Sequence, residues 1–210
     1  NYKRVPLDIS LALEHKPKTA DLVSLAETVV DNVNNLTAEI EYDEDGKSVY
    51  KGGFSKMVYR VNDGYSVIEK KLPVFKGAAA KPKPVLLSYP MCFTYITGIY
   101  IPFTFEPNIN YMYPDFILPM TMSHESAHLK GFAREDEAEF AAYLSCINSP
   151  DIYYQYSGYL NAYMRLSGSL GRADREAADA FYSRLDSRAK GDISYFGEFC
   201  DRFKSEVAEI

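Results

Sequence analysis

The chain is poor in the residues that cross-link a structure, with three cysteines and three histidines among 210 residues and no tryptophan. Cys92, Cys146 and Cys200 are odd in number and far apart, without a CxxC pair, so we expect buried thiols rather than disulfides or metal ligands. Basic residues are outnumbered, 23 against 29 acidic ones, and the net charge is −6. No basic stripe is present, which argues against nucleic acid as the main partner.

Long apolar runs are also missing. No stretch reaches the roughly 18 apolar residues that a membrane-spanning helix needs. The polar start at residues 1–10, without an initiating Met, does not have the pattern of a signal peptide. A hydrophobic content of 47% and a charged content of 25% are typical of a globular domain. We expect a single domain over residues 1–210, with an N-terminal helical part (1–84), a sheet and site core (85–148) and C-terminal helices (149–210).

Two of the three histidines lie in one pentapeptide, HESAH at residues 124–128. Residues four apart share one face of a helix, so His124 and His128 can bind a single metal ion. Glu125 follows the first histidine, where it can accept a proton from an activated water. This is the HExxH pattern of zinc-dependent hydrolases, although a bare HExxH also occurs in helices that bind nothing.

A zinc site of this kind needs a third protein ligand, and a carboxylate cluster follows directly. Gly131 predicts the end of the histidine helix, and the apolar run at 138–147 predicts a buried second helix. Acidic residues at the start of that helix would also suit its dipole, which is the purely structural alternative.

Three glutamates are candidates for the third ligand: Glu135, Glu137 and Glu139. Glu135 and Glu139 share a helix face at i, i+4, whereas Glu137 points away from it. With Ala138 they form Glu-x-x-Ala-acid, which begins the second helix of many zinc peptidases. We therefore expect Glu135 to bind the metal and Glu139 to brace a ligand histidine.

The remaining elements follow from apolar periodicity and turn residues. An amphipathic helix capped by Thr19 is expected, then an exposed turn at Asp43–Lys47. The run Phe93–Phe105 contains Pro102, which favours an edge strand, and such an edge beside an HExxH helix can bind an extended peptide. The other expected elements are a helix at Phe54–Leu72, a strand at Val85–Ser88, and helices at Ile152–Ser167, Arg172–Lys190 and Asp192–Ile210.

Several blocks of the sequence carry a resemblance to one family: residues 1–7, 83–85, 97–104, 124–140 and 156–160. The chain resembles the bacterial domain of unknown function 3810 family, whose members resemble zinc metallopeptidases. The family usually has HELAH where this chain has Ser126, and EDEAN where it has Glu139. Ser126 faces away from the metal by helical spacing, whereas Glu139 adds a charge near the ion.

The resemblance implies an α+β fold: a mostly helical, zincin-like metallopeptidase domain with a small sheet, and an HExxH helix followed by a glutamate-bearing helix, as in gluzincins. Members usually carry membrane-spanning segments at the N-terminus. It therefore implies a membrane-anchored protein, of which this chain is the soluble part that follows the anchor, with the side of the membrane left open.

The tyrosines allow one further assignment. There are 18 of them, and in a chain without tryptophan the simplest interpretation is that their rings supply large apolar groups for packing. The alternative is that one phenol stabilises an oxyanion during acyl transfer. Tyr156 is the candidate, through its place in the matched block at 156–160.

The leading hypothesis is a zinc-dependent peptidase acting on a peptide or protein substrate. His124, His128 and Glu135 would hold Zn²⁺, and Glu125 would act as the general base. One alternative is a catalytically silent zinc-binding or peptide-binding module, a sensor or scaffold at the membrane. Another is a di-iron helical bundle, which needs the Glu-x-x-His motif twice, and this chain has it once.

Overall fold

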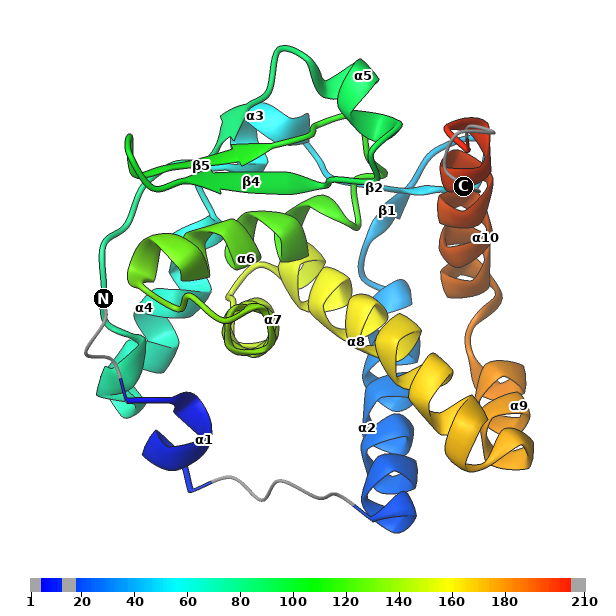
Figure 1. Ribbon diagram of the computed structural model, residues 1–210. Coiled ribbons are helices and arrows are strands. Elements are labelled where there is room, and N and C mark those ends of the chain that lie inside the picture. The colour runs from blue at the N-terminus through cyan, green and yellow to red at the C-terminus, as the bar shows by residue number, and fades with distance from the viewer. Residues whose placement is uncertain (1–4, 13–17, 205–210) are drawn as a thin grey trace.

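Apolar faces of long helices build the body of the protein, and a small sheet lies across one side of it (Figure 1). The computed structural model describes residues 5–12 and 18–204. In chain order the described elements are α1 (Leu7–Ser10), α2 (Thr19–Thr37), β1 (Glu41–Tyr42), β2 (Ser48–Val49), α3 (Gly53–Met57), α4 (Val61–Lys71), η1 (Pro73–Phe75), β3 (Lys83–Pro84), α5 (Ser88–Cys92), β4 (Gly98–Ile101), β5 (Glu106–Ile109), α6 (Leu118–Lys130), α7 (Glu135–Ile147), α8 (Ile152–Ala173), α9 (Arg175–Arg184) and α10 (Ser187–Arg202).

Helix α6 lies between two apolar cores, which explains why most of its residues are buried. Its N-terminal half, including Leu118 and Met122, packs into the larger core with α2, α8 and α10. Its C-terminal half places Ala127 in a smaller core with Leu7 of α1 and Tyr65 of α4. The helix that carries both histidines is therefore held on several sides by packing.

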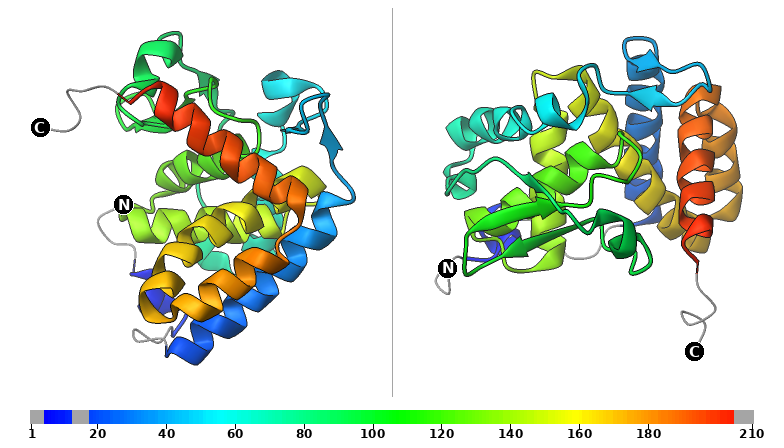
Figure 2. Two further views of the ribbon diagram at one scale, coloured as in Figure 1. Left: turned by 90° about the vertical axis from the view of Figure 1, so that its right-hand side faces the viewer. Right: turned by 90° about the horizontal axis from the view of Figure 1, so that it is seen from above.

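The sheet above α6 has the strand order β3-β5-β4 (Figures 1 and 2). Strand β3 runs parallel to β5, and β4 runs antiparallel to it. Among the described strands β4 is an edge, as Pro102 predicted. Together the helices and this small sheet give the mostly helical α+β architecture expected from the sequence. No helix within 5–12 or 18–204 combines the length and apolarity of a bilayer-spanning segment.

The predicted start of the first long helix is partly wrong. Helix α2 begins at Thr19 itself, and Lys18 precedes it as the N-cap residue without a side-chain cap. The Asp21 carboxylate accepts the backbone N–H of Lys18 at 2.8 Å, so the expected acid in the first turn does stabilise the helix start. The predicted turn at Asp43–Lys47 is confirmed as the connection between β1 and β2.

The single helix predicted at Phe54–Leu72 is wrong, because the chain breaks between α3 and α4. The Met57 carbonyl accepts the Tyr154 hydroxyl at 2.9 Å and the Arg60 N–H at 2.9 Å. In a continuous α-helix this carbonyl would accept the backbone N–H of the residue four positions later. Here it accepts the two bonds just named, and the chain tightens into a turn. Periodicity within the segment cannot reveal a contact with a tyrosine almost 100 positions away.

The strand boundaries also differ from the predictions. A strand was expected at Val85–Ser88, but the strand that forms is β3, which ends before Val85. Ser88 instead begins α5, and its hydroxyl donates a hydrogen bond to the Val85 carbonyl at 2.7 Å. Of the expected Phe93–Phe105 strand only β4 forms. Tyr95, with φ of 55°, belongs to a turn after α5.

The C-terminal helices begin at aspartate caps that the apolar pattern does not reveal. Asp174 accepts the N–H of Ala177 and starts α9, and Asp186 accepts the N–H of Arg188 and starts α10. The predicted boundaries Ser167, Arg172, Lys190 and Asp192 are therefore wrong. Residues 205–210, in the last predicted helix, lie outside the described part of the chain.

Replacing Gly64 by alanine tests how closely α4 packs on α7. A Cβ here would lie 1.9 Å from the Ser145 carbonyl oxygen, a backbone atom that cannot swing away. We expect Gly64→Ala to lower the free energy of unfolding in urea titrations by about 1–3 kcal/mol or more. Gly197→Ala in α10 is the control, because nothing lies within 4 Å of its added Cβ. It should stabilise the helix by roughly 0.5–1 kcal/mol. Similar changes in both variants would contradict the close approach.

Candidate metal centre

A glycine turn joins the two helices that form the site. Gly131 ends α6 in the left-handed conformation, with φ of 101°, as the sequence predicted. Helix α7 then begins at Glu135 and packs beside α6 through small buried residues, among them Ala138 and Ala142. Close packing of two helices brings the first residue of α7 next to the histidine face of α6.

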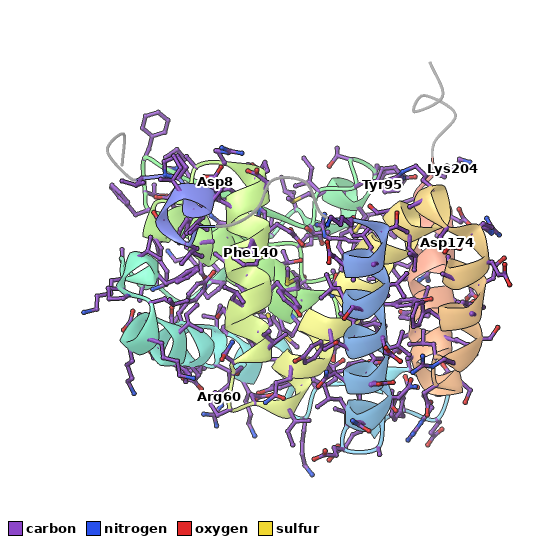
Figure 3. The ribbon with its side chains drawn as sticks, turned by 90° about the horizontal axis from the view of Figure 1, so that it is seen from below. Asp8, Arg60, Tyr95, Phe140, Asp174 and Lys204 are labelled. Atoms are coloured by element: carbon purple, nitrogen blue, oxygen red, sulfur yellow. The ribbon has the colours of Figure 1, made fainter. Side chains whose placement is uncertain are left out.

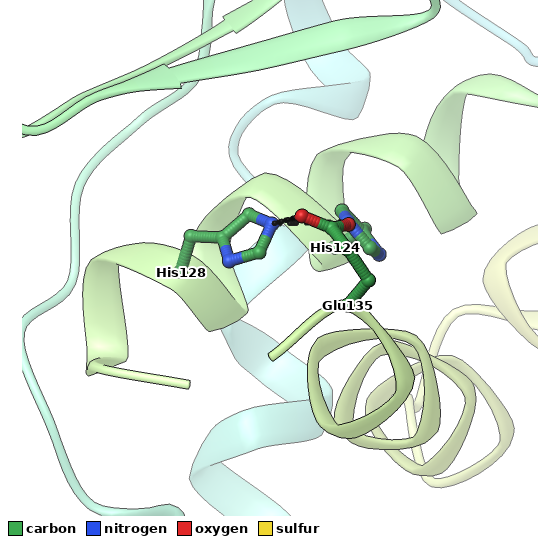
Figure 4. A group of neighbouring side chains, drawn as sticks. All are labelled: His124, His128 and Glu135. Carbon is green, nitrogen blue, oxygen red and sulfur yellow. Dashed lines mark hydrogen bonds and ion pairs between the residues drawn. The ribbon is translucent and has the colours of Figure 1, made fainter. Parts of the chain in front are cut away.

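The three predicted ligands converge above that face (Figure 4). The Nε2 atoms of His124 and His128 lie 3.1 Å apart. The Glu135 carboxylate lies 3.1 Å from His124 Nε2 and 3.6 Å from His128 Nε2. Ligand atoms about 2.0–2.1 Å from a tetrahedral zinc are roughly 3.3–3.4 Å apart. The donor set and its spacing therefore fit one zinc ion, which leaves a position for water.

The other ring nitrogen of each imidazole faces an oxygen acceptor. His128 Nδ1 lies 2.7 Å from the Phe132 carbonyl, so Nδ1 donates and Nε2 keeps its lone pair for a metal. His124 Nδ1 lies 3.2 Å from the Glu139 carboxylate, close enough to pair. Glu139 in turn contacts the Arg165 guanidinium at 2.6 Å. Glu139 thus lies beside His124, and its role in bracing the ring stays a prediction; Arg165 offsets the charge of Glu139.

The charges around His124 act in opposite directions. Burial lowers the pKa of His124, but the carboxylates of Glu139, Glu125 and Glu135 outweigh it, and the net shift is upward. The three carboxylates therefore create a negative site that favours a cation.

The Glu137 carboxylate is engaged away from the two histidines. Its carboxylate accepts the backbone N–H of Leu7 at 2.8 Å and so joins α7 to α1. Asp136 pairs with the neighbouring Arg134. Glu135 rather than Glu137 therefore lies with the two histidines, and its assignment as the third ligand stays a prediction.

Glu125 lies beside the ligands and under strand β4. It is only 6% exposed. Burial raises its pKa to about 7, while His124 and the N–H of Tyr100 act in the opposite direction. Gly98 makes this approach possible, since a Cβ there would lie 2.8 Å from Glu125 Cγ. A carboxyl group with this pKa can exchange a proton near neutral pH.

A cleft of about 1060 Å³ begins at His124, Glu125 and Glu135 and extends between α7 and α8. Arg165 and Asn161 of α8 supply polar groups at its wall. Neither Arg165 nor Gly98 was predicted as a site residue, because each reaches the site through tertiary packing. Most of its lining is apolar, as in Leu25, Met120, Phe140, Tyr143, Met164 and Phe196.

Tyr156 does not belong to this site, and its predicted role is corrected. The side chain is fully buried and its hydroxyl donates to Asp192 of α10 at 2.6 Å. Asp192 also accepts the N–H of Ser48 at 2.9 Å. Tyr156 therefore ties α8 to α10, which is a structural role, and it does not line the cleft.

The comparison with protein families covers the whole chain: residues 1–210 match the family described as "Protein of unknown function (DUF3810)". The chain belongs to this family. No curated protein and no solved structure matches this DUF3810 member. The family assignment confirms the resemblance seen in the sequence, and its description names no activity.

Zinc titration of the ligand variants tests the centre. We expect one zinc per chain and a rise in melting temperature on zinc addition. His124→Ala, His128→Ala and Glu135→Gln should each weaken zinc binding by more than about 100-fold, and Glu139→Gln by about 10- to 100-fold. Glu137→Gln is the matched control and should keep wild-type affinity, because its carboxylate faces Leu7. Loss of zinc in Glu137→Gln with retention in Glu135→Gln would reverse the ligand assignment.

Tyr156→Phe separates a structural role from a catalytic one. Removing the hydroxyl takes one hydrogen bond from the buried Asp192 carboxylate. We expect the free energy of unfolding to fall by about 1–3 kcal/mol in urea titrations. Zinc affinity should be unchanged. A variant with full stability but altered zinc binding would contradict the structural role.

Proposed function

We propose that this DUF3810 member is a zinc-dependent metallopeptidase with a zincin-like, gluzincin-type site. His124, His128 and Glu135 would hold the ion. The observation that carries the proposal is the position of Glu125, buried beside those ligands at the start of a cleft, with a pKa of about 7. A structural metal site needs no such group, whereas hydrolysis needs a base at this place.

The chemistry divides between the ion and the chain. Zinc, when bound, supplies a Lewis acid that activates water and polarises a carbonyl. Glu125 accepts the proton of the attacking water at its carboxylate and later delivers it to the leaving amine nitrogen. Glu139 keeps the His124 ring in place, and Arg165 balances the charge of Glu139. The apolar lining of the cleft excludes water around these groups.

An extended peptide is the substrate that the edge strand supports. The backbone N–H of Tyr100 in β4 donates to Glu125. Strand β4 pairs with β5 on one side, and its other edge, which is unpaired among the described strands, therefore faces the site. A peptide that pairs with this edge gains main-chain hydrogen bonds and brings a scissile bond toward Glu125. Substrate side chains would then enter the apolar cleft.

Anchoring in a bacterial membrane by a segment that precedes this chain is part of the proposal. It rests on the family resemblance. The substrate would then be a peptide or protein at the membrane surface.

Glu125→Gln is the test of the peptidase mechanism. Glutamine keeps the shape of the side chain but cannot take up the proton. With zinc-loaded protein and an unstructured casein substrate, we expect hydrolysis to fall by about 10²- to 10⁴-fold, while zinc stoichiometry stays at the wild-type value. Glu198→Gln, on the exposed side of α10, is the control and should keep full activity.

Two outcomes would reject the mechanism. Retained hydrolysis in Glu125→Gln would exclude this residue as the base. Stoichiometric zinc in the wild type without cleavage of any unstructured peptide would favour the silent zinc-binding or peptide-binding module instead.

A further inference from the structure

The cleft beside the candidate metal centre lies at one end of strand β4. Its lining includes residues 95–98, the last of which begins the strand, but not residues 99–101, which complete it. From Glu125 the cleft therefore extends toward the Gly98 end of β4 and away from the Ile101 end.

Some of the apolar side chains that line this cleft stay exposed to water. Leu25 is 43% exposed, Tyr95 41% and Ile96 43%, and all three belong to the wall of the cleft. Apolar groups left in water around a hollow mark a contact surface for an apolar ligand. The cleft is therefore suited to a ligand that covers these groups with apolar groups of its own.

The walls that α2, α8 and α10 contribute to the cleft carry little charge. Seen from below, α8 lies between α2 and α7, the helix that carries the labelled Phe140 (Figure 3). Among the described residues that α2, α8 and α10 place in the lining, Arg165 is the one charged side chain, and it already contacts Glu139 at 2.6 Å. A charged substrate residue would lose its water here without gaining a partner, whereas an apolar one would be stabilised by burial. The other lining residues of these helices are Leu25, Val29, Asn161, Ala162, Met164, Leu166 and Phe196.

The direction of β4 decides which part of a bound peptide reaches the cleft. Antiparallel pairing is slightly more stable per residue than parallel pairing, so a peptide on the free edge of β4 would run from the Ile101 end toward Gly98. Its scissile bond would lie at Glu125, which approaches both Gly98 and the N–H of Tyr100. The residues that follow this bond then continue past Gly98 along residues 95–97, where the cleft lies.

We propose that the cleft is a specificity pocket for a large apolar side chain on the residue directly after the scissile bond. The inference rests on the proposed peptidase function and deepens it. The substrate is then an extended peptide that is cut on the amino side of residues such as leucine, phenylalanine, isoleucine or methionine. Ile96, two residues before Gly98, belongs to the wall that this side chain contacts.

Ile96 and Ile99 provide a matched pair of variants. Both are exposed isoleucines, 43% and 47% exposed, but only Ile96 lines the cleft. A Cβ at Gly98 would point at Glu125, so the next side chain, Ile99, points to the opposite face of the sheet. Ile96→Glu therefore places a charge in the cleft wall, whereas Ile99→Glu places it outside the cleft. Because both positions are exposed, both variants should keep the wild-type melting temperature and zinc stoichiometry.

Cleavage of matched peptides tests the proposal. Zinc-loaded protein is given unstructured peptides of alanine and glycine with one central leucine, lysine or serine, and the cut bonds are identified by mass spectrometry. We expect the wild type to cut directly before the leucine, with a kcat/KM about 10- to 100-fold above that for the serine peptide. Ile96→Glu should lower the ratio of leucine to lysine cleavage by about tenfold or more, because a carboxylate in the wall favours a cation over an apolar group. Ile99→Glu should keep the wild-type ratio.

Binding of the same peptides to zinc-loaded Glu125→Gln protein separates the pocket from the reaction. With a fluorescent label on each peptide, anisotropy should show that the leucine peptide binds about tenfold or more tightly than the serine peptide. Ile96→Glu, added to this variant, should remove the difference.

Two results would overturn the pocket while the peptidase function stands. One is cleavage after the leucine, or equal kcat/KM for the three peptides. The other is the same ratio of leucine to lysine cleavage in Ile96→Glu and Ile99→Glu. If the wild type cuts neither these peptides nor casein, the proposed function fails. Leucine-selective binding that Ile96→Glu removes would then support the apolar pocket alone, and equal binding of the leucine and serine peptides would overturn the pocket as well.

Discussion

The close packing of α6 on α7 is the constraint on which the candidate site depends. Gly131 reverses the chain in a conformation that other residues adopt only with strain. The facing residues of α7 are small, so the helix axes can approach. As a result Glu135, although its side chain is 80% exposed, lies beside two histidines, and the Phe132 carbonyl holds the His128 ring from behind. A larger side chain at the interface would separate the ligands without altering any of them.

How much of this could be predicted depends on the range of the interactions. The ligand set follows from contacts within one or two helix turns: i, i+4 for the histidines, a glycine stop, and i, i+4 again for Glu135 and Glu139. Tyr156 could not be placed in the same way. Its partner, Asp192, is 36 positions away, and nothing local indicates it. The break before α4 likewise involves a distant partner, Tyr154, and the starts of α9 and α10 depend on the caps Asp174 and Asp186.

Strand β4 has two effects on one carboxyl group. It covers Glu125 and so raises its pKa by burial, and it also donates the Tyr100 N–H that limits the rise. The strand is short, and Gly98 removes the side chain that would otherwise push Glu125 aside. The environment of the residue therefore depends on the sheet as much as on its own helix.

The hydrogen bond between Glu137 and Leu7 makes the start of the described chain a mechanical part of α7. Leu7 is buried against Ala138 and Ala141 of that helix. A force applied along the chain before α1 would therefore act on the turn that carries Glu135, two residues from Glu137. Residues 5–12 and the first turn of α7, which begins with Glu135, are therefore joined by packing and by one hydrogen bond.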